Sequence, residues 1–469
     1  MAFNTTSGLM SPDSLPSLDE RYEEGRAQRE HSPRATLATL AERPASYDPV
    51  ARLMWQGESR VAQLLPIRYQ RMLVNPLAFY RGCALLMADD LARGPSTAIE
   101  VQICGDAHLS NFGVFSSPER QQVFDVNDFD ETDVGPFEWD VKRLVTSTAI
   151  ASHYLGHDAH QQETIAVDVA KEYRRAMQRF ARETRLDVWY STLDVDAVMK
   201  DLHGFLADHA MQRVNAVIGG AKSQDSAKSY GKMVNNENVR PRIRLQPPLI
   251  NALGDTGSSP AMSEVLDRVL DGYKATLSSD RRELLSQFVP VDVARKVVGV
   301  GSVGTRCYVM LFVGRDRDDP FFLQFKEAQS SAVSLARGRS SPLQPGERVV
   351  HGQKLMQATP DPFLGWYTLD VEGVSRSFYV RQLYDNKASV IIEQLNESLL
   401  VAYGRACSWA LARAHARSGR SAEIAGYLGK NDRFETSVTA FALAYRDRNQ
   451  SDYLELQSAA KQGRITVAS

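Results

Sequence analysis

The spacing of hydrophobic residues changes twice along the chain. From residue 48 to 91, and again in several segments between 137 and 288, apolar positions recur every three or four residues, as in Val50, Leu53 and Met54, which is the period of amphipathic helices. Residues 290–388 are instead rich in β-branched and aromatic side chains, which favour strands. Helical spacing returns over 389–469. The pattern predicts an α+β fold in which a β-rich unit interrupts a mainly helical one.

Two further stretches carry little hydrophobic pattern. Residues 1–47 are rich in Ser, Pro, Glu and Arg and poor in apolar residues, so we expect a mobile N-terminal arm. Residues 219–248 are polar, with Gly, Lys, Ser and Asn and almost no apolar period. That composition predicts a long surface loop just before the β-rich unit.

Short strands are expected inside the first helical segment. Residues 99–103 alternate in polarity, and 112–116 and 123–126 flank a turn containing Ser and Pro, which predicts a hairpin. Helices follow, one from Phe137 to about Tyr154 and a longer one capped by Asp158.

Composition excludes several classes of protein. Lys and Arg total 55 against 57 for Asp and Glu, and this balance is atypical of proteins that bind nucleic acid or anionic membranes. No apolar stretch reaches membrane-spanning length, and the N-terminus has no apolar signal core. The four cysteines lie too far apart for a zinc ribbon. We therefore expect a cytoplasmic protein with no nucleic-acid or membrane partner.

The predicted hairpin carries the most informative polar residues. Asp106 and Asn111 precede its first strand and Asp128 follows its second, so the open end of the hairpin brings all three together. Two carboxylates and an amide oxygen form a hard site suited to Mg²⁺. A carboxylate beside such a site can orient or deprotonate a hydroxyl. The alternative is a polar turn of solvated acids.

A glycine-rich turn opens the β-rich unit. Gly299, Gly301 and Gly304 lie in GVGSVG, and strand-like rather than helical residues follow. A dinucleotide-binding fold requires a helix there, whereas a strand–glycine turn–strand covers nucleotide phosphates in kinases. Lys326 ends the next strand, from which a cation can reach the α and β phosphates. The alternative is an ordinary glycine turn with a snorkelling lysine.

Taken together, the two segments resemble the protein-kinase-like superfamily, in particular its aminoglycoside phosphotransferase and choline kinase branch. The catalytic loop of that branch reads H-G-D-x-H-x-x-N, and a metal-binding Asp and a buried Asp on a helix follow it. The matching residues here are Gly105, Asp106, His108, Asn111, Asp128-Phe129-Asp130 and Trp139-Asp140, with Cys104 in place of the first His.

Longer stretches of sequence are similar to the domain of unknown function 2252 family of bacterial proteins. The stretches cover most of the chain after the arm: FYRG at 79–82, GDAHLSNFG at 105–113, RKVVGVGSVGTR at 295–306, YVRQL at 379–383 and ALARAHARSG at 410–419.

The order of the parts departs from that of kinases, in which glycine loop, lysine, helix C, hinge and helix E precede the catalytic loop and the metal-binding Asp. Here the last two come first. The resemblance therefore implies a circularly permuted, two-lobed kinase-like fold, with the β-rich nucleotide lobe at 290–388 inserted between 48–289 and 389–469. Permutation is tolerated where the original termini lie close together.

The resemblance also implies residue roles. Asp106 would orient the acceptor hydroxyl, Asn111 and Asp128 would hold Mg²⁺, and Lys326 would pair with the ATP phosphates. The glycine turn and the hinge would contact the rest of the nucleotide, through Gly299, Gly301, Ser302, Gly304, Gln382 and Leu383.

One element of the kinase pattern is incomplete. Glu347 stands at the start of the predicted helix C, but His351 is expected at the inward position where a glutamate partner of Lys326 belongs. Glu327 is a poor substitute, because adjacent strand residues point to opposite faces.

These features leave three functions open. The first is an ATP- and Mg²⁺-dependent phosphotransferase acting on a hydroxyl of a small molecule or protein. The second is a pseudokinase that binds nucleotide as an interaction module, and the third is a nucleotidyltransferase that transfers AMP.

Overall fold

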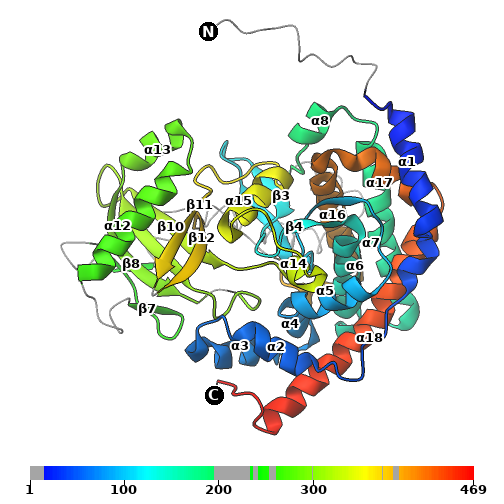
Figure 1. The fold of residues 1–469 in the computed structure, drawn as a ribbon, viewed down its shortest axis with the longest axis horizontal. Coiled ribbons are helices and arrows are strands. Elements are labelled where there is room, and N and C mark those ends of the chain that lie inside the picture. The colour runs from blue at the N-terminus through cyan, green and yellow to red at the C-terminus, as the bar shows by residue number, and fades with distance from the viewer. Residues whose placement is uncertain are drawn as a thin grey trace, which may run out of the picture.

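The computed structural model describes residues 15–194, 233–235, 241–252, 260–297, 299–371, 373–383 and 390–468. These residues form a mixed helical and strand fold, with a sheet on one side of the molecule and packed helices on the other (Figure 1). The α+β prediction is confirmed at this level. The first part of the loop expected at 219–248 falls outside the described residues.

A six-stranded antiparallel sheet forms the β-rich unit. Its strands are ordered β11-β12-β10-β9-β8-β7. Their bounds are β7 Ile250–Ala252, β8 Val289–Lys296, β9 Cys307–Val313, β10 Pro320–Ala328, β11 Gly365–Val371 and β12 Val374–Gln382. Alternating residues of β10 face opposite sides, so Phe321, Leu323 and Phe325 belong to one buried cluster and Phe322 to another.

Helices cover this sheet on both sides. α12 (Pro260–Ala275) packs on β11, and Tyr273 of α12 meets the ring of Phe325 edge to face. α13 (Ser279–Ser286) precedes β8. α14 (Ala332–Arg337) and α15 (Pro345–Met356) follow β10, and α15 contacts β10, β11 and β12. In Figure 1 these last two helices lie between the sheet and the helical side.

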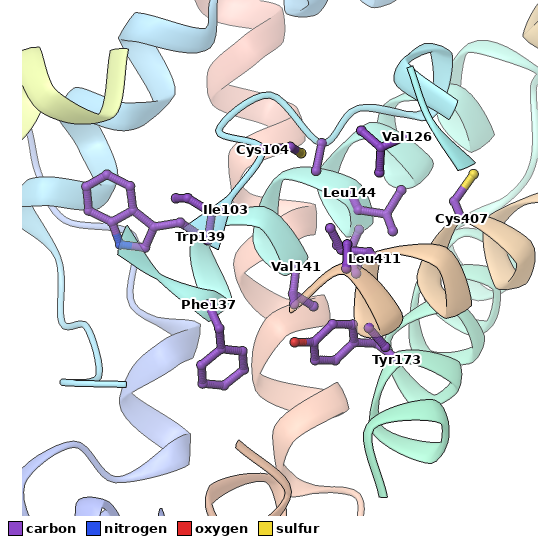
Figure 2. Packing of buried hydrophobic residues seen from close by; sticks show 14 of the residues in the cluster. Ile103, Cys104, Val126, Phe137, Trp139, Val141, Leu144, Tyr173, Cys407 and Leu411 are labelled. Carbon is purple, nitrogen blue, oxygen red and sulfur yellow. The ribbon is translucent and has the colours of Figure 1, made fainter. Parts of the chain in front are cut away.

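The helical side is assembled from two distant parts of the chain. α6 (Phe137–Tyr154) and α7 (Ala159–Phe180) pack against α16 (Glu397–His415) and α18 (Arg433–Lys461). Figure 2 shows Phe137, Leu144, Tyr173 and Leu411, contributed by three of these helices, within one buried cluster. Residues some 240 positions or more apart in sequence therefore share a single core. The helices α8 (Arg185–Tyr190) and α17 (Ser421–Leu428) complete this side.

Two small antiparallel sheets lie between these sides. β2 (Phe112–Ser116) pairs with β3 (Gln122–Val126), which confirms the predicted hairpin. β1 (Glu100–Ile103) pairs with β4 (Asp133–Pro136), a strand that the sequence pattern did not indicate because it contains Gly and Pro. The helices α2 Pro49–Gly57, α3 Leu65–Met72, α4 Pro76–Arg81 and α5 Ala84–Arg93 precede them.

The expectation of a mobile N-terminal arm was wrong for residues 18–47. α1 (Leu18–His31) lies along α17, and Arg34 donates to the Leu428 carbonyl at 2.5 Å. Glycine permits this close approach, because a Cβ at Gly25 would lie 1.8 Å from the Glu423 carbonyl oxygen. Close backbone contacts and arginine hydrogen bonds hold this segment together with a few apolar side chains, of which Leu37 is fully buried in the main core.

The sheet unit also contains strands that the sequence pattern did not indicate. β8 ends at Lys296, and the glycine run follows as a hydrogen-bonded turn before β9. β11 was not anticipated. The described part of the expected loop at 219–248 contains a two-stranded ribbon of β5 (Val234–Asn235) and β6 (Arg242–Ile243). Val234 and Ile243 pack with Phe322 on the sheet, and this tertiary burial stabilises strands that local sequence does not favour.

None of the described helices combines the length and apolarity that crossing a membrane requires. All four cysteines are buried and free.

Candidate active site

A cavity of about 830 Å³ lies between the open end of the hairpin and the glycine turn. Asp106, Asn111 and Asp128 line it from the hairpin side, and Gly299, Gly301 and Ser302 line it from the other. The sequence-predicted metal site and phosphate-binding turn therefore face a single cavity, although about 170 residues separate them in the chain.

The loop that carries Asp106 is held by a buried carboxylate. Asp140, on the first turn of α6, accepts the backbone N–H groups of Cys104 at 2.7 Å and Gly105 at 2.9 Å. His415 of α16 contributes a third contact, with its Nε2 3.1 Å from Asp140 Oδ2. Gly105 has φ +73° and passes close to Glu131, where a Cβ would clash with the backbone. The loop is thereby fixed relative to both halves of the helical core.

Asp106 is flanked by a buried arginine. Arg143 Nε, one turn after Asp140 on α6, donates to Asp106 Oδ1 at 2.5 Å. Burial raises the pKa of Asp106 to about 7, with the Arg143 charge acting in the opposite direction and the carboxylates of Glu131 and Asp128 adding to the rise. A carboxyl group that titrates near neutral pH is suited to accept a proton from a hydroxyl.

The Asn111 side chain is held with its oxygen unused. Its Nδ2 donates to the backbone carbonyls of Asp106 and Asp128, each at 3.0 Å. Its Oδ1 is buried and has no hydrogen-bond partner in the described part of the chain. A buried acceptor without a hydrogen-bond partner destabilises the fold unless a ligand interacts with it. The amide is therefore oriented as a metal ligand would be.

Asp128 lies beside Asn111 with its side chain 43 % exposed to the cavity. The described residues contain no group of three or more His, Cys, Asp or Glu side chains that could hold a metal. The donors here are instead one carboxylate and one amide oxygen, and Mg²⁺ commonly takes waters and phosphate oxygens as its other ligands. The residues fit a magnesium site of that kind.

Lys326, at the end of β10, is only 2 % exposed and does not line the cavity. Its ammonium group forms an ion pair with Asp130 and lies 3.7 Å from Asp128 Oδ2. Asp130 also accepts hydrogen bonds from Tyr379 at 2.7 Å and Ser302 at 2.9 Å. Lys326 is therefore separated from the cavity by Asp128 and Asp130, and its ion pair links the sheet to the segment after the hairpin.

The expectation that His351 faces inward from helix C was wrong. On α15 the buried residues include Arg348, Val349, Gly352 and Met356, so His351 falls on the exposed face. Arg348 takes the inward position and donates to the carbonyls of Asp130 at 2.8 Å and Gln329 at 2.9 Å.

The acid partner of Lys326 therefore comes from the hairpin rather than from the helix. Glu327 faces away from Lys326, as expected, and pairs with Arg306 and Arg376.

Arg60 braces the glycine turn from outside the sheet. Its guanidinium donates to the carbonyls of Gly301 at 2.8 Å and Val303 at 2.6 Å. Burial lowers the pKa of Arg60 to about 9. Gly304 has φ +92°, and a Cβ there would press against Arg60 at 3.0 Å. Gly304 shapes the turn without lining the cavity, unlike Gly299 and Gly301.

The predicted hinge residues Gln382 and Leu383 line a second cavity, of about 760 Å³. Their backbone N–H groups are already bonded, Gln382 to Asp361 Oδ2 at 2.5 Å and Leu383 to the Phe322 carbonyl at 3.0 Å. Residues 384–389, which follow, lie outside the described residues. Gly299 and Asn127 line both cavities, so the two spaces adjoin there.

Three residues that shape this site, Asp130, Arg143 and Arg60, have no predicted role in the sequence. Asp130 belongs to the Asp128-Phe129-Asp130 motif, but its ion pair with Lys326 was not predicted. Arg143 lies three residues after Asp140 and so shares its helix face, a signal that could have placed it beside Asp106. Arg60 precedes its partners by about 240 residues, and local sequence carries no sign of that contact.

Comparison with known proteins identifies the family. A model described as an uncharacterized protein conserved in bacteria, DUF2252, matches residues 60–459. No curated protein and no solved structure matches the chain. The match spans α3 through most of α18 and includes both the hairpin and the glycine turn. The chain therefore belongs to the DUF2252 family.

Proposed function

We propose that this protein is an ATP- and Mg²⁺-dependent phosphotransferase that acts on a hydroxyl of a small molecule or protein. The observation that carries the proposal is the orphaned Oδ1 of Asn111, buried beside Asp128 on a cavity closed by a glycine turn. A metal ion and the phosphates of a nucleotide would complete this polar arrangement.

The order of elements supports a kinase-like arrangement. The sheet unit contains the glycine turn between β8 and β9, Lys326 on β10, then α15, then β12, which is the order that kinases use for glycine loop, lysine, helix C and hinge. α16 follows and packs against α6 and α7. The hairpin with Asp106 comes first in the chain, so we infer a circularly permuted fold of two lobes.

Each side chain then has a role. Asp106 accepts the proton of the acceptor hydroxyl, and Arg143 holds that carboxylate in place. Asn111 and Asp128 hold Mg²⁺, which when bound supplies positive charge against the phosphate oxygens. Lys326 keeps Asp128 and Asp130 positioned through its ion pairs. Catalysis of this kind depends mainly on positioning and charge neutralisation.

The rate should depend on pH through Asp106. With a pKa of about 7, its basic form disappears in acid, so transfer should fall about tenfold per pH unit below 7 and level off above it. The folded chain keeps a proton on Asp106 that the unfolded chain releases above about pH 4, so the contribution of this group to stability falls as pH rises from 4 to 7. A kcat/KM profile from pH 5 to 9 measures the first effect. A profile that stays flat across this range would rule out Asp106 as the base.

The reaction is tested with ATP labelled at either the γ or the α phosphate. The full chain is incubated with Mg²⁺ and a desalted bacterial extract as the source of acceptors, with EDTA in a parallel sample. Transfer of the γ label that EDTA abolishes supports phosphotransfer. Thermal stabilisation by ATP without transfer of either label would identify a nucleotide-binding module instead.

Transfer of the α label would show AMP transfer with the nucleotide reversed in the site. One observation favours this second candidate: the N–H groups of Gln382 and Leu383 are already bonded within the protein, so these two donors are not open to adenine at the expected hinge.

A further inference from the structure

The second cavity differs from the first in the charge of its walls. Five of the described residues that line it are basic and two are acidic: Arg71, Arg120, Arg281, Lys296 and Arg381 against Asp319 and Asp361. The first cavity has the opposite excess, with six acidic and four basic side chains among its described lining residues. Cations gathered from separate elements around one cavity attract anionic ligands.

Two polar atoms in this wall lack partners in the described part of the chain. Asn127 is 7 % exposed, and its Nδ2 donor is buried and unpaired, as is Thr359 Oγ1. The Asn127 backbone carbonyl is occupied by Arg381 Nη1 at 3.3 Å, so the residue is held while its amide N–H₂ remains free. A buried donor without a protein partner is energetically costly, and the oxygen of a ligand would satisfy it.

Asn127 connects the second cavity with the proposed reacting centre. Asn127 directly precedes Asp128 and lies where the two cavities adjoin, together with Gly299. A ligand group in the second cavity can therefore be covalently continuous with a phosphate at Asp128. A cavity of about 760 Å³ with cationic walls suits several phosphate oxygens better than a neutral adenine ring.

We propose that the second cavity is a phosphate-binding subsite, which holds a pyrophosphate-like group through its basic side chains and the Asn127 amide. This inference rests on the proposed function, because it names the chemical class of a ligand that extends from the proposed reacting centre. The phosphates come from one of two ligands. One is ATP, with its phosphate tail in this cavity and adenosine in the first, and the other is a phosphorylated acceptor.

Binding of inorganic pyrophosphate to the full chain tests the subsite without any turnover. Titration calorimetry compares wild type with Lys296→Gln and Arg281→Gln, two partly exposed side chains on β8 and α13. The matched control is Arg179→Gln on α7, whose side chain is 65 % exposed and remote from this cavity. Each cavity variant should weaken binding about tenfold, and the control should leave it unchanged.

Binding should also weaken as salt rises, because partly exposed charges are screened. Equal pyrophosphate affinity in the wild type and both cavity variants, or no measurable binding, overturns the subsite. Circular dichroism of each variant separates lost binding from lost fold. Asn127→Asp provides a third cavity variant, since a carboxylate at that position repels phosphate and should weaken binding further.

The labelled-ATP reaction then identifies the source of the phosphates. If the tail of ATP occupies the subsite, Lys296→Gln lowers transfer of the α label and raises the KM for ATP. If a phosphorylated acceptor occupies it, the same variant lowers transfer of the γ label while the KM for ATP stays unchanged. If the cavity variants lose pyrophosphate affinity and the wild type transfers neither label, the result supports the subsite while refuting the proposed enzymatic function.

Discussion

Replacement of Asp128 by Asn should reduce label transfer from ATP about a thousandfold. The change removes the carboxylate that, with Asn111, is expected to hold Mg²⁺, while the shape of the side chain is kept. Lys326 retains its ion pair with Asp130, so the melting temperature should stay within about 2 °C of wild type. Radiolabel transfer and differential scanning calorimetry measure the two quantities.

A matched control for this variant is Asp447→Asn on α18, where an exposed carboxylate pairs with Arg446. Its transfer rate should equal that of wild type. Binding of Mn²⁺ in the presence of ATP, followed by electron paramagnetic resonance, reports on the metal site directly and should be weakened only by Asp128→Asn. Retention of more than a tenth of the activity by Asp128→Asn would show that the metal lies elsewhere.

Replacement of Asp140 by Ala should lower the free energy of unfolding by about 3–5 kcal/mol. Asp140 is 1 % exposed and accepts hydrogen bonds from the backbone of Cys104 and Gly105 besides its contact with His415. The variant leaves the buried N–H of Cys104, the partly buried N–H of Gly105 and the buried imidazole of His415 without their acceptor. Urea denaturation followed by tryptophan fluorescence measures the loss, and transfer activity should fall as well because Asp106 follows in the same loop.

Asp140→Asn separates the effect of the lost acceptors from that of the lost volume. The amide keeps one acceptor oxygen in the same place, so its loss of stability should be about half that of the alanine variant. A loss below about 1 kcal/mol for Asp140→Ala would mean that the loop is held by other contacts.

Local sequence predicted the elements whose signals lie within a few residues. The cap of α7 is an example. The Asp158 side chain accepts the backbone N–H of Gln161, and the Gln161 side chain accepts the backbone N–H of Asp158, as the spacing indicates. The β2–β3 hairpin and helix α6 follow from the same kind of evidence. The grouping of Asp106, Asn111 and Asp128 at one cavity was also predictable, because a hairpin necessarily joins its open ends.

Contacts between distant segments were not predictable in this way. Asp130 pairs with Lys326 and Arg60 braces Gly301, each across roughly 200 residues or more of chain. The inward position on α15 belongs to Arg348 rather than His351, because the helix rotates to bury Val349 and Met356. α1 packs on α17 through glycine backbones, a contact that a hydrophobic pattern cannot register.

Short-range spacing and recognisable strings of residues were enough to predict the mixed fold, the family, and the residues gathered at the hairpin and the glycine turn. Three features follow instead from the packing of distant segments: the acid that pairs with Lys326, the arginine that braces the glycine turn, and the cavity rich in basic residues beside the site. These depend on how packed elements are rotated and placed against each other, and burial of side chains from the whole chain, rather than local propensity, sets that arrangement.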